Sequence, residues 1–257
     1  LPPASFASSD ADHAQARFRD EDESPTWNWA RPFIYRLADQ HVATGYPDGT
    51  FRPDTPVTRA EFATMVTKAF PSSGPAGPAQ QCAVVNFEDV DSDDWFAAHV
   101  EAAVQNCWLS GYREDGDRRF KPNKPITRTE LYVALISGLE GSRQFQGALP
   151  EAPATAAEFN AEFRDSSAIA DWAKPALAAA LSNRLMLKGW YDPDSSTHPL
   201  GKYEDYANDF EPTRPATRAE TAMALFRAMV VANLTEPLDP KLNRAYEVAP
   251  SGGTSER

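Results

Sequence analysis

Three arginines in a repeated context are the residues of this chain best suited to binding chemistry. Thr58–Glu61 reads Thr-Arg-Ala-Glu, and closely related segments return at Thr127–Glu130 and Thr217–Glu220. A Thr-x-x-Glu segment before apolar residues predicts a helix N-terminus, because the threonine hydroxyl accepts a backbone N–H and the glutamate accepts the threonine N–H. The arginine then occupies the first helical position, where the helix dipole favours anions over cations. Its presence there in all three copies needs a separate explanation.

Two roles for these arginines are open. In the structural role each forms a salt bridge with a nearby carboxylate. In the functional role the guanidinium and the free N–H groups of the helix together bind an anion. The residues alone favour the structural role. The candidate anion-binding residues are Arg59, Arg128 and Arg218, and the predicted capping residues are Thr58, Glu61, Thr127, Glu130, Thr217 and Glu220.

Patterns typical of enzymes and metal sites are missing from the sequence. The four histidines are scattered, and two cysteines cannot complete a structural zinc site. The Asp-x-Asp segments that begin at Asp89 and Asp192 lack the glycine and the final glutamate of a calcium-binding EF-hand loop. Nucleotide-binding loops and a nucleophile elbow are also missing. We therefore expect no catalysis, no cofactor and no metal.

Composition limits the class of protein and its partners. The 257 residues are 42% hydrophobic, enough for one or two ordinary domains. The net charge of -12 argues against nucleic acid or an anionic membrane as the main partner, because both select a basic surface. No apolar run approaches the roughly 18 residues of a membrane-spanning helix. The first residue is Leu1 rather than methionine, which is compatible with a removed export signal.

Cys82 and Cys107 are the only cysteines and bracket the start of the second repeat. In an exported protein they would form a disulfide. Two buried free thiols are the alternative, and the sequence leaves both open.

Each repeat also predicts a helix before the arginine segment. A tryptophan opens an apolar pattern at helical spacing, and a glycine followed by an aromatic residue ends it. We expect each glycine to stop its helix in the left-handed conformation. On an apolar helix face the tryptophans are expected in the core more often than at a ligand. The tryptophans are Trp29, Trp95 and Trp172, and the glycines are Gly45, Gly111 and Gly189.

These patterns divide the chain into three units joined by linkers. The predicted boundaries are an N-terminal arm (1–17), unit 1 (18–70), a linker (71–86), unit 2 (87–140), a linker (141–162), unit 3 (163–232) with an inserted loop (191–209), and a C-terminal tail (233–257).

The assembled unit resembles the S-layer homology (SLH) domain. The resemblance rests on Phe-x-Asp, the tryptophan, Gly-aromatic, Asp-Gly, Phe-x-Pro and Thr-Arg-x-Glu, and it is closest in Gly45–Pro53 with Thr58–Glu61. It covers roughly residues 18 to 232. It implies a mainly helical, all-α fold, in which three helix-loop-helix repeats form a pseudo-threefold spindle. Unit 3 departs from the pattern, because it lacks the Asp-Gly turn and carries the insertion.

The resemblance also implies a function. SLH domains anchor exported proteins by holding anionic, often pyruvylated, cell-wall polysaccharide or a peptidoglycan-linked polymer in grooves between repeats. The location implied is the cell wall, cell surface or periplasm. Within that family a binding role for Arg59 becomes favoured over the structural one. A protein-protein interaction subunit of an envelope complex is the alternative. The glycan contacts implied are Arg59, Arg128, Arg218, Gly45, Gly111, Gly189, Trp29, Trp95, Trp172 and Asp48.

Overall fold

The computed structural model describes residues 17–21, 23–24, 26–71, 82, 86–141, 143–145, 147–149, 151–186 and 209–238. Several predictions lie outside these residues. They are the N-terminal arm up to residue 16, most of the linker 71–86, Gly189, the inserted loop except residue 209, and the tail beyond residue 238.

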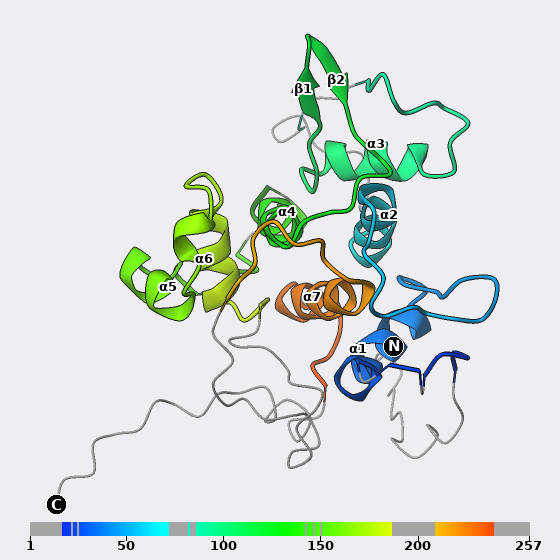
Figure 1. The fold of residues 1–257 in the computed structure, drawn as a ribbon, viewed down its shortest axis with the longest axis horizontal. Coiled ribbons are helices and arrows are strands. Elements are labelled where there is room, and N and C mark those ends of the chain that lie inside the picture. The colour runs from blue at the N-terminus through cyan, green and yellow to red at the C-terminus, as the bar shows by residue number, and fades with distance from the viewer. Residues whose placement is uncertain are drawn as a thin grey trace, which may run out of the picture.

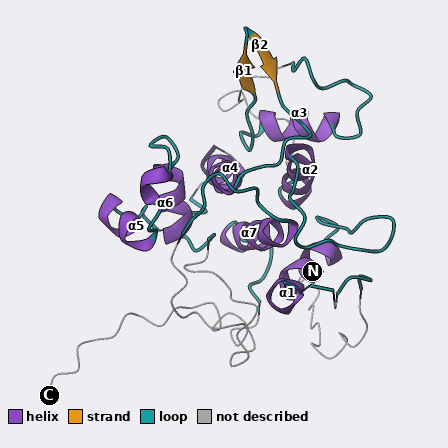
Figure 2. Cartoon of the chain, in the orientation of Figure 1, coloured by secondary structure: helices purple, strands orange, loops and turns teal. Residues whose placement is uncertain are grey.

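The described part of the chain is mainly helical, as the sequence predicts (Figures 1 and 2). None of its helices is both long and apolar enough to cross a membrane. The α-helices are α1 (Trp27–Asp39), α2 (Arg59–Ala69), α3 (Ala97–Gln105), α4 (Arg128–Gly141), α5 (Ala156–Glu162), α6 (Lys174–Ser182) and α7 (Arg218–Val231). Strands β1 (Tyr112–Glu114) and β2 (Asp117–Arg119) form an antiparallel hairpin, and short 3-10 helices cover Arg143–Phe145 and Ser166–Ala168.

The three units are interlocked rather than packed as separate helix pairs. The first helix of each unit packs on the second helix of another unit: α1 on α7, α3 on α2, and α6 on α4. Figure 1 shows α2, α4 and α7 near the centre with α1, α3 and α6 outside them. Each unit therefore needs the other two to bury its helices.

A ring of hydrogen bonds marks a pseudo-threefold axis. Val57, Ile126 and Ala216 immediately precede the capping threonines and are fully buried. The Val57 N–H donates to the Ala216 carbonyl (3.0 Å), the Ala216 N–H to the Ile126 carbonyl (2.9 Å), and the Ile126 N–H to the Val57 carbonyl (2.9 Å). The expected pseudo-threefold arrangement is thus built from the backbone of the three helix starts.

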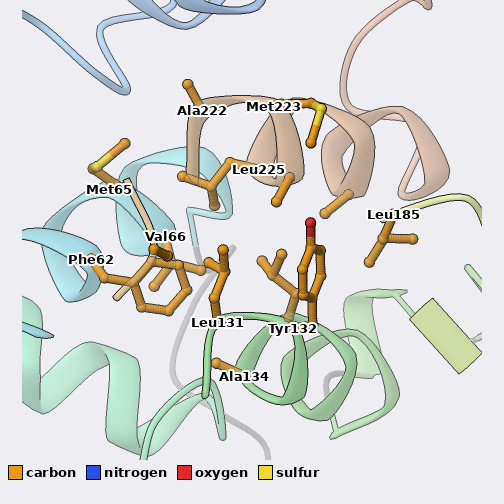
Figure 3. Packing of buried hydrophobic residues seen from close by; sticks show 14 of the residues in the cluster. Phe62, Met65, Val66, Leu131, Tyr132, Ala134, Leu185, Ala222, Met223 and Leu225 are labelled. Atoms are coloured by element: carbon orange, nitrogen blue, oxygen red, sulfur yellow. The ribbon is translucent and has the colours of Figure 1, made fainter. Parts of the chain in front are cut away.

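One hydrophobic core fills the space between the three central helices. Figure 3 shows Phe62 and Val66 of α2, Leu131 of α4 and Leu225 of α7 turned toward one another. All four are fully or almost fully buried. The residues that follow the arginines at helical spacing thus form the core, as their periodicity predicts.

The predicted left-handed conformation belongs to other residues than the glycines. His41, Cys107 and Arg184, just past the first helices, have φ of 57°, 63° and 58°. Gly45 and Gly111 do not have positive φ. A Cβ on Gly111 would lie 2.1 Å from Phe87 Cε1 and 2.8 Å from the Arg119 carbonyl oxygen. Glycine is required there because side chain and backbone approach closely, so the expected helix-stop role was wrong for Gly45 and Gly111.

The aspartate of each Phe-x-Asp segment fixes the turn before the second helix. Asp89 accepts hydrogen bonds from the Phe120 N–H (2.7 Å) and the Lys121 N–H (2.8 Å). Lys121 has φ of 59°, an unusual value for a residue with a side chain. Asp20 and Asp165 make the same pair of bonds in units 1 and 3, where Arg52 and Glu211 have positive φ. The carboxylate therefore holds a strained turn in all three units.

Two elements were missed by the sequence analysis. Helix α5 lies in the segment predicted as a linker, and Thr155 and Glu158 form a capping box at its start. The β1–β2 hairpin lies where only a turn was expected. Asp115 and Gly116 join its strands with φ of 53° and 93°, as a type I′ turn requires. Both signals, Thr-x-x-Glu and Asp-Gly, are readable in the sequence.

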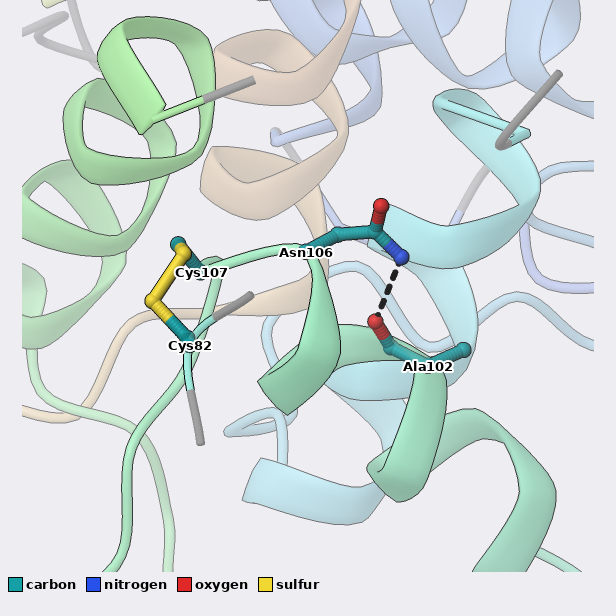
Figure 4. Close-up of a disulfide and its surroundings, with 4 residues drawn as sticks. All are labelled: Cys82, Ala102, Asn106 and Cys107. Carbon is teal, nitrogen blue, oxygen red and sulfur yellow. Dashed lines mark hydrogen bonds between the residues drawn. A yellow bond between two sulfur atoms is a disulfide. The ribbon is translucent and has the colours of Figure 1, made fainter. Parts of the chain in front are cut away.

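Cys82 and Cys107 form a disulfide, so the free-thiol alternative does not hold (Figure 4). Cys107 lies just past the end of α3, next to Asn106, whose side chain donates to the Ala102 carbonyl oxygen (2.8 Å). The disulfide ties residue 82 to the end of α3.

Candidate functional site

The helix N-termini are capped as predicted, but their N–H groups are not free. Thr58 and Glu61 form a complete capping box, and the same pattern occurs at Thr217 with Glu220 and at Thr127 with Glu130. The Arg59 N–H donates to the Lys124 carbonyl (2.9 Å) and the Ala60 N–H to the Pro122 carbonyl (3.0 Å). The expectation of free helix N–H groups at an anion site was therefore wrong, because the neighbouring unit occupies them.

The three arginine side chains each reach into the next unit. The Nε–H of Arg59 donates to the Phe120 carbonyl, that of Arg128 to the Phe210 carbonyl, and that of Arg218 to the Phe51 carbonyl, each at 2.8 Å. Each guanidinium also lies over the ring of the same phenylalanine, at 4.6 to 5.3 Å. All three arginines thus connect two units through a backbone carbonyl, and what distinguishes them is the rest of their surroundings.

Arg59 has neutral partners. Its Nη2 donates to the Ser110 carbonyl oxygen (2.6 Å), and its guanidinium lies 4.7 Å from the Tyr112 ring centroid. These hydrogen bonds use two of the five N–H donors of a guanidinium. No carboxylate in the described part of the chain forms an ion pair with it. Burial lowers the pKa of Arg59, while Tyr112, Glu130 and Asp89 oppose this effect.

A cavity of about 610 Å³ opens beside Arg59 and is lined by all three units. Arg59 comes from unit 1, Gly111 and Tyr112 from unit 2, and Trp172 from unit 3. We call this space the Arg59 cavity. Among the other predicted site residues, Glu130, Cys82 and Cys107 also line it. Sequence reasoning did not single out Tyr112, Arg113 or Arg118, which line it as well.

The three tryptophans were expected in the core, and this expectation was wrong for Trp95 and Trp172. Trp95 and Trp172 are both 66% exposed, and Trp29 is partly buried against the core. Trp27, at the start of α1, is fully buried, and Trp108 is 2% exposed. Each exposed tryptophan is followed by a buried residue, Phe96 or Ala173, which takes the core position. Only Trp172 of the predicted three lines the Arg59 cavity.

Arg128 has a carboxylate partner. Its Nη1 donates to Glu220 Oε1 at 2.6 Å, and the Arg214 side chain donates to the same oxygen. The Arg128 and Glu220 side chains are 11% and 7% exposed. This arginine therefore has the salt bridge of the structural alternative.

Arg218 and Asp48 are also engaged with their own surroundings. Arg218 lies 4.6 Å from the Tyr46 ring centroid, and its Nη1 is 4.0 Å from Glu61 Oε1. Asp48 accepts hydrogen bonds from the Thr50 N–H (3.0 Å) and hydroxyl (2.7 Å) and pairs with Arg52. The Thr50 hydroxyl, the Thr50 N–H and Arg52 hold the pKa of Asp48 well below its usual range.

Glu130 also lines the Arg59 cavity and has its own hydrogen-bond partners. Its Oε1 accepts hydrogen bonds from the Tyr112 hydroxyl (2.6 Å) and Lys124 Nζ (3.0 Å). Burial would raise the pKa of Glu130, but hydrogen bonds from the Thr127 N–H, Tyr112 and Lys124 outweigh burial and lower it. This carboxylate therefore stays ionised and is already paired.

Comparison with known proteins identifies the units. The S-layer homology domain model matches residues 19–63 and 86–131. These two segments belong to the SLH domain family. The two matches fall in units 1 and 2, and each ends within the first turns of the second helix, at Ala63 in α2 and Leu131 in α4.

Similar proteins are much longer than this chain. It is 29% identical over 206 residues to an exoglucanase, XynX, of Acetivibrio thermocellus, an alignment that covers 80% of this chain and 16% of that protein. It is 28% identical to a surface-layer 125 kDa protein of Lysinibacillus sphaericus, over 82% of this chain and 15% of that protein. A cellulosome-anchoring protein of Acetivibrio thermocellus is 34% identical over 43% of this chain and 23% of its own length.

Proposed function

We propose that this chain is a non-enzymatic anchoring module of the cell envelope. It binds an anionic, possibly pyruvylated, cell-wall polysaccharide or peptidoglycan-linked polymer in the Arg59 cavity. The surface-layer and cellulosome-anchoring relatives support a cell-surface location. Unit 3 acts as a third SLH repeat, because it makes the same arginine, aspartate and capping contacts as units 1 and 2.

The observation that carries the proposal is a guanidinium at the wall of a cavity that forms no ion pair with any described carboxylate. Arg59 lines the cavity, and its described hydrogen bonds go to neutral carbonyl groups. A carboxylate of the polymer would accept from its remaining N–H donors in a partly dry site, where charge-assisted hydrogen bonds are strong. The exposed ring of Trp172 in the same cavity offers an apolar face to a sugar.

Co-sedimentation with cell-wall sacculi of the organism that produces the chain tests this function. The wild-type chain is expected to sediment with sacculi and to be released when their ketal groups are removed by mild acid. Arg59→Gln removes the cation and should lower the affinity about tenfold, the loss of one charge-assisted hydrogen bond. Arg164→Gln is the control, because Arg164 is 65% exposed and pairs with Asp209 at 3.1 Å, outside the cavity.

Two outcomes would contradict the proposal. A folded Arg59→Gln variant that sediments like wild type would exclude this cavity as the binding site. A wild-type chain that ignores sacculi but leaves mild extraction in a stoichiometric complex would favour the protein-interaction subunit instead.

A further inference from the structure

The β1–β2 hairpin places two arginines directly opposite each other at the Arg59 cavity. Arg113 on β1 pairs in register with Arg118 on β2. Residues paired across an antiparallel ladder project to the same face, so the two guanidinium groups share one side of the hairpin. Both side chains are exposed and both line the cavity.

Arg113 and Arg118 have no ion pair in the described residues, unlike the other charged residues of strands β1 and β2. Glu114 and Asp117 are also directly opposite each other, but Glu114 pairs with Lys121 and Asp117 with Arg119 (3.7 Å). In the described residues no carboxylate pairs with Arg113 or Arg118. Like charges directly opposite each other destabilise a hairpin. In a chain with a net charge of -12, a pair of uncompensated cations beside a cavity is poised for an anion from outside.

Between units 1 and 2, where the structure describes this segment, only unit 2 has the hairpin. In unit 1 the corresponding segment is a tight turn, in which the Asp48 carboxylate pairs with Arg52. In unit 2 the chain from Gly111 continues through Tyr112 into β1, so Arg113 follows two residues that line the cavity with Arg59. The extension thus adds positive charge at the Arg59 cavity, where Arg59 has no ion pair with a described residue.

We propose that Arg113 and Arg118 form a second anion subsite of the Arg59 cavity. The polymer it selects is a polyanion: one acidic group meets Arg59, and a neighbouring carboxylate or phosphate bridges Arg113 and Arg118. The cavity then distinguishes a strand with repeated acidic groups from one with a single acidic terminus. This inference rests on the proposed function, because it names the kind of polymer that the same cavity binds.

Charge reversal at one position gives the sharpest test. Arg118→Glu replaces the repulsion with a cross-strand ion pair to Arg113, so the melting temperature of the free chain should stay the same or rise. The same variant should lower the affinity for sacculi more than tenfold, since it removes one cation, pairs the other and adds an anion. A stability increase together with a binding loss is not expected of a merely structural residue.

Neutral and conservative variants complete the design. Arg113→Gln with Arg118→Gln should lower the affinity for sacculi about tenfold and flatten its decline with added salt, because two screened charge contacts are lost. Arg113→Lys with Arg118→Lys keeps both charges and should retain most of the binding. Arg119→Gln is the matched control, because Arg119 is adjacent on β2, pairs with Asp117 and does not line the cavity.

The outcomes separate this inference from the proposed function. If Arg59→Gln loses binding while the double glutamine variant and Arg118→Glu bind like wild type, the second subsite is wrong and the anchoring function stands. If wild type itself does not bind sacculi, the anchoring function fails first. Carbodiimide amidation of the sacculi neutralises carboxylates and leaves phosphodiesters charged, so it removes the carboxylate contact at Arg59 in either case. Residual binding that Arg113→Gln with Arg118→Gln then abolishes indicates a phosphate at the second subsite.

Discussion

The surroundings of Arg59 and of Arg128 show how one repeated segment serves two purposes. Both arginines occupy the first position of a capped helix, and both donate to a phenylalanine carbonyl of the next unit at 2.8 Å. Arg128 then pairs with the buried carboxylate of Glu220, whereas Arg59 faces a cavity and a tyrosine ring. The shared contacts hold the three units together, and the difference leaves Arg59 without an ion pair in the described residues.

The capping glutamates Glu130 and Glu220 also have different partners. In unit 2 the Tyr112 hydroxyl donates to Glu130, and the Tyr112 ring lies beside Arg59. The capping glutamate is therefore paired without reaching the arginine of the preceding unit. In unit 3 the capping glutamate, Glu220, accepts from Arg128 instead.

The largest expected effect distinguishes the two capping glutamates. Glu220→Gln leaves Arg128 buried without its carboxylate and should destabilise the chain by about 3–5 kcal/mol, the usual consequence of removing one partner of a buried pair. Glu130→Gln should cost far less, because Glu130 is partly exposed and Gln can still cap the helix. Urea denaturation measures both. Equal losses in the two variants would show that the Arg128 contact is not special.

A methyl group added at Gly111 tests how closely the wall of the Arg59 cavity is packed. Gly111→Ala places a methyl group against Phe87 and the Arg119 carbonyl, so we expect a loss of about 1–3 kcal/mol. Gly45→Ala meets Thr50 and Phe18 in the same way and should lose a similar amount. Thermal denaturation checks both variants. An unchanged melting temperature would mean that the backbone relaxes without strain and that glycine is not required.

Two equally exposed tryptophans test the location of the binding site. Trp172→Ala should change the free energy of unfolding by no more than about 0.5 kcal/mol relative to wild type, as expected of a surface substitution. It should weaken binding to sacculi severalfold, because an aromatic contact contributes about 1 kcal/mol. Trp95→Ala is the control: Trp95 is also 66% exposed but does not line the Arg59 cavity. Equal binding losses in the two variants would place the glycan elsewhere.

The smallest expected effect is the pH dependence contributed by Glu130. Its pKa is lowered in the folded chain, so its stabilising contribution is fully present above the unfolded pKa, which is about 4.3. The contribution is lost as the pH falls through the lower, folded pKa. We expect it to be below about 1 kcal/mol, because the side chain is partly exposed. Stability measured from pH 7 to pH 3 should fall less in Glu130→Gln than in wild type, and parallel curves would contradict the assignment.

The sequence predicted the parts of the fold that depend on local chemistry. The capping boxes at Thr58, Thr127 and Thr217 follow from side chains that lie three residues apart, and the core positions follow from helical periodicity. The interlocking of the units did not follow. The apolar face of α1 packs against α7, which lies nearly 200 positions further along the chain, and no local pattern predicts this contact.

The candidate site was predicted in its residue types but not in its geometry. Arg59 and Gly111 were named, yet the helix N–H groups are occupied by Lys124 and Pro122 of the next unit, which a local pattern does not reveal. The positive charge of the hairpin was missed because Asp115-Gly116 was expected as a turn without paired strands, although Asp-Gly favours a hairpin.

The central claim is that Arg59, and not Arg128, meets the ligand. Nuclear magnetic resonance of arginine side-chain Nε–Hε groups tests it directly, because soluble wall polymer can be titrated into the chain and each signal assigned with Arg→Lys variants. The signal of Arg59 is expected to shift in proportion to bound polymer, while that of Arg128, held between Phe210 and Glu220, stays in place. A shift of the Arg128 signal with an unmoved Arg59 signal would contradict the account.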